Sequence, residues 1–108
     1  MKKYIEKNEL ATLFFVHYFK YTRYAFKKVK SDEDKASINA HRTLMRMFGA
    51  WHQEGRVLAE QVIAKLKIYI VSSNSPYVQR VSDVMQESVN FLYDYVLEEE
   101  HHLLERYA

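Results

Sequence analysis

Five histidines are the first candidates for chemistry, because a neutral imidazole can ligate a metal or move a proton near neutral pH. They are His17, His41, His52, His101 and His102. If one helix carries His41 and His52, the two lie about 16 Å apart along its axis, too far for one ion. A pair across two helices, His17 with His41 or with His52, remains open. The alternative is that these are core or edge imidazoles bonded to a tyrosine or a carbonyl.

A second candidate is the run 98–102, EEEHH, which contains two overlapping Glu-x-x-His matches. In di-metal helical bundles this spacing needs a second such motif on another helix and two further carboxylates. The chain has no second match. We therefore predict a solvated helix end at this run, and no bound metal or other cofactor.

The spacing of Arg46 and His52 resembles the short Arg–His motif of HEPN-type helical ribonucleases, which implies RNA cleavage by these two side chains. On one straight helix, however, the six-residue offset turns them about 120° away from each other. Met47 also follows Arg46, where that family usually has a polar residue. Elsewhere the sequence has no strand-to-helix turn or oxyanion turn that would activate a serine nucleophile. The absence of cysteine excludes thiol chemistry. We therefore predict that the chain is not an enzyme.

The richest segment is 18–30, YFKYTRYAFKKVK, in which five basic residues alternate with five aromatic ones. Cations attract phosphate, and exposed rings stack on unpaired bases, so this composition is typical of single-strand binding. Arginines in the next segment would extend the positive surface. The predicted nucleic-acid contacts are Lys20, Arg23, Lys27, Lys28, Arg42 and Arg46. The alternative is that the rings belong to the core and the bases to its solvated edge.

The elements that must position these residues are helices. Two glycines and one proline in 108 residues leave too little turn-forming material for a β-sandwich, a barrel or a Gly-rich phosphate loop. Ser31 with Asp34 resembles a capping box, and Ser75 before Pro76 forms a second helix start. We therefore expect an all-α single domain, 1–108.

The apolar periodicity predicts a bundle of three long antiparallel helices, about 8–30, 32–71 and 76–106. In the second helix the apolar phase continues without a slip across Gly49 and Gly55. A kink or a split near Gly49 to Gly55 is the alternative, since each glycine costs about 1 kcal/mol relative to alanine inside a helix.

The first predicted helix carries more apolar surface than two neighbours can cover. Its apolar side chains spread over about two thirds of the circumference, whereas a surface helix needs a stripe of little more than a third. The surplus predicts a protein interface and a homo-oligomer or a larger complex. The predicted interface residues are Phe15, Phe19, Tyr24 and Phe26.

Charge is distributed unevenly along the chain. Residues 1–67 hold 14 basic and 7 acidic residues, a net +7, and residues 68–108 hold 2 and 7, a net −5. Such a chain suits an acidic partner for its first part, or head-to-tail association. A small helical bundle with a basic and an acidic face is similar in form to the small helical subunits of CRISPR effector complexes and to phage and plasmid accessory proteins. That resemblance implies a subunit aligned along nucleic acid.

These features together predict a non-enzymatic cytoplasmic subunit that self-associates or joins a larger complex and binds the backbone of nucleic acid, single strands included. The alternative is a pure protein-interaction module, an adaptor, inhibitor or oligomeric scaffold, whose aromatic first helix meets a protein. No segment is apolar over the length of a bilayer span. A basic amphipathic helix lying on an anionic membrane is a third interpretation.

Overall fold

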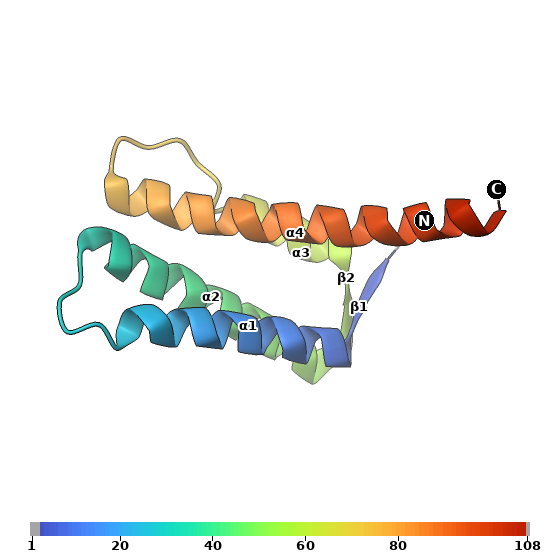
Figure 1. Cartoon of the computed structure of the whole chain (residues 1–108), viewed down its shortest axis with the longest axis horizontal. Helices are drawn as coiled ribbons and strands as arrows, with labels where there is room; N and C mark the ends of the chain where they lie inside the picture. Colours follow the sequence, from blue (N-terminus) through green and yellow to red (C-terminus); the bar gives the residue numbers. More distant parts are fainter. Residues whose placement is uncertain (1–2, 108) are drawn as a thin grey trace.

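The chain forms two helical hairpins joined by a short sheet (Figure 1). The computed structural model describes the backbone of residues 3–107 and the side chains of residues 3–96. The elements, in chain order, are β1 (Tyr4–Glu6), α1 (Lys7–Ala25), α2 (Asp32–Glu54), β2 (Arg56–Leu58), α3 (Ala59–Lys67) and α4 (Pro76–Tyr107). The predominantly helical character is confirmed. The predicted count of three helices is wrong, since this part of the chain forms four helices and two short strands.

The predicted helix 32–71 is divided at Gly55. The φ of Gly55, +99°, is accessible to glycine and strained for other residues. The Gly55 N–H donates to the carbonyls of Trp51 and His52, both at 3.1 Å. The split is therefore confirmed at Gly55, whereas Gly49 stays inside α2 beneath the ring of Phe14. Periodicity did not reveal the break because the buried residues on both sides of it face one common core.

The predicted helix 8–30 ends early, at Ala25. The basic residues of 27–30 therefore lie in the connection to α2, where Lys27 Nζ donates to Asp34 Oδ1 at 2.9 Å. The predicted capping box is confirmed: Ser31 Oγ accepts from the Asp34 N–H at 3.1 Å, and Asp34 Oδ2 accepts from the Ser31 N–H at 3.0 Å. Because this box starts α2 at Asp32, the chain has to leave α1 and turn before it.

The two strands lead directly into α1 and α3. They pair antiparallel with Ile5 opposite Val57, both buried, and the Ala59 N–H donates to the Lys3 carbonyl at 2.9 Å. A three-residue strand is too short to show a clear alternation of apolar and polar residues, which is why the sequence does not predict β1. Because the strands are antiparallel, α1 leaves the ribbon at the end where Glu6 pairs with Arg56, and α3 leaves it at the opposite end, beside Tyr4.

Helix α2 packs against both α1 and α4, and these two helices face each other. α1 packs along α2, while α4 packs on α2 and α3 and runs antiparallel to α1 (Figure 1). One apolar core joins all the elements, with Leu10, Leu44, Phe48, Leu66 and Met85 among its fully buried members. Because one side of α1 packs against α2, α2 does not cover the other sides of this helix.

Substitution at the two glycines tests this architecture. Gly55→Ala should lower the free energy of unfolding by about 1–2 kcal/mol, because a Cβ is strained at this positive φ. Gly49→Ala is the matched control: its Cβ would meet the Phe14 ring at 3.7 Å, an ordinary contact. It should leave stability unchanged or raise it by up to about 1 kcal/mol. Urea unfolding measures both, and equal effects of the two substitutions would contradict the break at Gly55.

Candidate functional site

The outer side of α1 exposes aromatic rings. Phe15 is 54% exposed and Phe19, one turn later, is 66% exposed, while Phe26 just beyond the helix is 82% exposed. We call these three residues the aromatic stripe. Tyr24, which we grouped with them, lies on the inner side: its ring stacks on His41 at 6.2 Å, and its hydroxyl accepts from Arg80 at 3.4 Å.

Most of the predicted basic contacts are free to meet a ligand. Lys27 forms an ion pair with Asp34, and Arg42 donates to Asn39 Oδ1 at 2.7 Å. The ion pair and the Ser31 N–H bond lower the pKa of the Asp34 carboxyl. The other four cations are exposed and form no ion pair with a described side chain; they are Lys20, Arg23, Lys28 and Arg46.

The predicted cations within α1 and α2 lie on both flanks of the aromatic stripe. Lys20 lines the space between α1 and α4, and Arg23 follows one turn later on that flank. On the opposite flank, α1 meets α2 around Phe14, Phe15 and Gly49. Helical phase places Arg42 and Arg46 on the exposed side of α2 beyond Gly49. A strand lying across the stripe would thus meet positive charge on either side.

Two of the five histidines form a buried pair across α1 and α2. His17 Nδ1 and His41 Nδ1 are 3.1 Å apart, and the His17 ring stacks on Phe48 at a centroid distance of 5.7 Å. The cross-helix pair that the sequence left open is therefore His17 with His41. His52 lies apart, on the opposite flank of α1 beside Phe15. Within the described residues no three metal-ligating side chains come together.

Both paired histidines are neutral at pH 7. Burial, then the charges of His41 and Lys20, lower the pKa of His17 to about 3. Burial, then the charges of Lys20 and Arg80, lower the pKa of His41 to about 4. An Nδ1–Nδ1 hydrogen bond between neutral rings requires one Nδ1–H donor, which leaves its own Nε2 bare and puts the partner's proton on Nε2. The pair therefore offers one N–H donor and one nitrogen acceptor.

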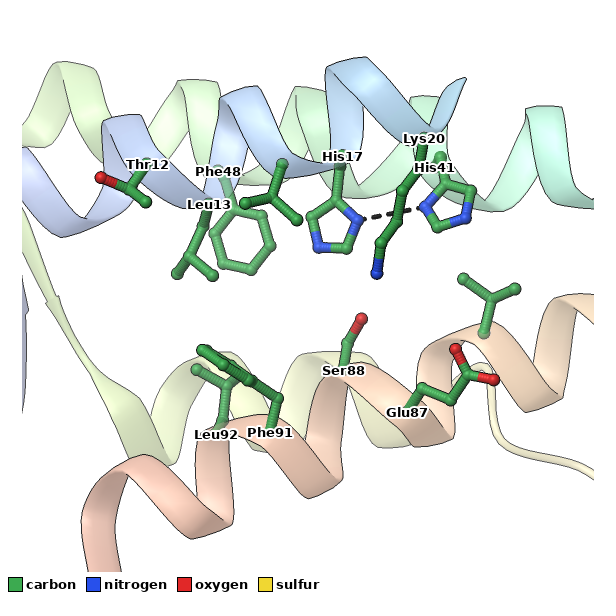
Figure 2. A pocket seen from close by; sticks show the side chains of 12 residues that line it. Thr12, Leu13, His17, Lys20, His41, Phe48, Glu87, Ser88, Phe91 and Leu92 are labelled. Atoms are coloured by element: carbon green, nitrogen blue, oxygen red, sulfur yellow. Dashed lines mark hydrogen bonds between the residues drawn. The ribbon is translucent and has the colours of Figure 1, made fainter. Parts of the chain in front are cut away.

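The histidine pair borders a groove between α1 and α4 (Figure 2). Its cavity has a volume of about 210 Å³, with Lys20 entering from α1 and Glu87 and Ser88 from α4. A second cavity of about 130 Å³ shares Thr12, Leu13, Phe91 and Leu92 with the first and continues to Tyr95. Burial and a hydrogen bond to Glu9 raise the pKa of the Tyr95 hydroxyl.

Sequence reasoning missed this groove, because its two walls, α1 and α4, are more than sixty residues apart in the chain. The only local signal is that Thr12, Val16 and Lys20 lie on the least apolar side of α1, which composition alone would leave to solvent. In the structure Thr12, Val16 and Lys20 are exposed and also line the open cavity.

The ribonuclease-like pair is not brought together. Arg46 and His52 both lie in the uninterrupted part of α2, ahead of the break at Gly55, so their offset of about 120° persists. The motif residues 98–102, with His101 and His102, lie outside the side chains that the structure describes.

No family model, no curated protein and no solved structure matches this chain. Across residues 3–107, no helix combines the length and the apolar character needed to cross a membrane. Function therefore has to be inferred from the chemistry of the surface and of the groove.

The histidine pair makes stability depend on pH. Because the folded pKa values, about 3 and about 4, lie below the ordinary 6.5, the unfolded chain binds more protons between these limits. The contribution of the pair to the free energy of unfolding is fully present above the ordinary pKa of 6.5, and it falls as the pH drops below that value. From about pH 7.5 to about pH 5 the loss should be roughly 2 kcal/mol for each imidazole, measured by urea unfolding at both values.

The double variant His17→Leu/His41→Leu should lose most of this dependence, since it removes both titrating rings together. His52→Gln, which removes a histidine outside the pair, should retain it. A double variant as sensitive to pH as the unaltered chain would show that other groups cause the effect.

Proposed function

We propose that this protein is a non-catalytic cytoplasmic subunit that binds single-stranded nucleic acid through the aromatic stripe and the cations on its flanks. The observation that carries the proposal is the exposure of Phe15, Phe19 and Phe26 beside cations that form no ion pair with a described side chain. If the rings belonged to the core, the bases would be only its solvated edge. Their exposure favours the binding interpretation.

The physical basis is the combination of stacking and charge. An exposed ring stacks on a base of any sequence with about 1–3 kcal/mol, and this requires the base to be unpaired. Phosphate attraction adds a term that depends on salt. Residues 18–46 hold 8 basic and 3 acidic residues, a net +5, so the α1–α2 hairpin has the charge that a polyanion requires.

Binding of a labelled single strand of about 20 nucleotides at low salt, followed by fluorescence anisotropy, tests the proposal. Phe19→Ala or Phe26→Ala should each weaken binding by about 5- to 150-fold, through loss of one stacked base. Arg23→Gln/Lys28→Gln should reduce the slope of log affinity against log salt by about 1.4, two phosphate contacts on a single strand.

The matched control is Lys65→Gln/Lys67→Gln, which removes two exposed cations from α3. It should change neither the affinity nor the slope by a comparable amount. Absence of binding at low salt would contradict the proposal. Equal effects of the two double variants would show that the strand does not bind at the aromatic stripe and its flanking cations.

A second candidate is a protein-interaction module, and the same aromatic stripe favours it. Phe15, Phe19 and Phe26 carry no polar atom in their side chains, and an apolar surface of this kind is typical of a protein contact. In this alternative the stripe packs against another copy of the chain or against a larger protein.

Sedimentation equilibrium distinguishes the two candidates. If the stripe is a self-association surface, Phe15→Ser/Phe19→Ser should convert oligomer to monomer. The control Ile68→Ser replaces an apolar side chain, 74% exposed, in the connection before α4, and should leave the oligomer intact. Association that depends on the stripe, without strand binding in any variant, would favour the second candidate. A chain that is monomeric at all concentrations would exclude self-association.

A further inference from the structure

The groove between α1 and α4 has a polar end and an apolar end. Lys20, Ser88 and the histidine pair lie at the first, with Glu87 on the rim. From there the groove continues between Leu13 and Phe91 towards Ile5 and Tyr95. Lys20 and Glu9, which line the two ends, are about 16 Å apart along the axis of α1. This shape suits an elongated ligand with one polar head.

The polar end favours an anion. Lys20 has no ion-pair partner among the described side chains, and Figure 2 shows its side chain extending from α1 towards α4. The pKa of His17 and that of His41 both respond to the charge of Lys20, and the latter also to Arg80. The charges nearest the histidine pair are therefore positive, and Glu87 is the one acid among the described residues that line this end.

Neutral donors complete the polar end. Ser88 Oγ points from α4 towards His17 in Figure 2, and one of the two imidazoles must carry its proton on Nε2. An ammonium and these neutral donors together suit a carboxylate head, because hydrogen bonds to a charged acceptor are the stronger ones.

We propose that the groove between α1 and α4 binds a free medium-chain carboxylic acid, with its carboxylate at Lys20 and Ser88 and its alkyl tail between Leu13 and Phe91. This site is separate from the aromatic stripe and does not depend on strand binding. It would make the chain a carrier or a sensor of an acyl carboxylate.

Isothermal titration of the full chain with decanoate, below its micelle concentration, tests the proposal. Decanol, which has the same tail without the charge, should bind about tenfold more weakly or worse. Decylamine should bind more weakly still, because Lys20 repels its ammonium. From hexanoate to octanoate to decanoate, affinity should rise about fourfold for each added methylene until the apolar end is filled.

Variants assign the binding to the groove. Lys20→Met should weaken decanoate binding about tenfold or more, through loss of the charged donor. Glu87→Gln should strengthen it, because a like charge leaves the rim. Val16→Trp, at a half-exposed position on the wall, should block the groove, with circular dichroism as the check on folding. Phe26→Ala, which removes a ring of the aromatic stripe, should have no effect.

Several results would overturn the proposal. Absence of decanoate binding would do so, as would tighter binding of decylamine or a loss of decanoate binding in Glu87→Gln. Equal affinity of folded Val16→Trp and the unaltered chain would place the ligand outside the groove. None of these results bears on strand binding, so the two proposals fail separately.

Discussion

The antiparallel pairing of β1 with β2 determines where both helical hairpins stand. Ile5 and Val57 are buried opposite each other, and each strand leads into its helix without a connecting loop. α1 and α3 therefore start from opposite ends of this two-stranded ribbon, which sets the two hairpins apart. α4 returns from α3 and packs on α2, which leaves it across from α1. The groove follows from this placement, because α1 and α4 both pack on α2 and leave a cavity between them.

The α1–α2 interface is held partly by flat rings. Phe48, His17, His41 and Tyr24 stack in succession along the hairpin, with interplanar angles of 4°, 26° and 9°. Neutral imidazoles suit this position, because a buried charge without a partner would be costly. At one end of the stack Arg80 donates to Ser37 Oγ at 2.9 Å and reaches the Tyr24 hydroxyl, which ties α4 to the hairpin.

The breadth of the apolar surface of α1 has a structural explanation. One side packs on α2 through Leu10 and His17, and a second side lines the groove through Leu13 and Val16. The third side carries the aromatic stripe and remains exposed. A single helix therefore serves the core, a groove and an outer surface. The proposed strand-binding surface and the proposed acyl site lie on adjacent sides of it, with Lys20 at their boundary.

The sequence by itself determined the helical class, the capping box at Ser31 and the start of α4 at Pro76, because these depend on residues three or four apart. It left open whether the second helix breaks, since the apolar phase is the same on both sides of Gly55. It predicted a surplus of aromatic surface, but not that Tyr24 would stack on His41 while the aromatic stripe stays exposed. Tertiary structure alone decided the histidine partner and the groove, because both depend on contacts between segments far apart in the chain.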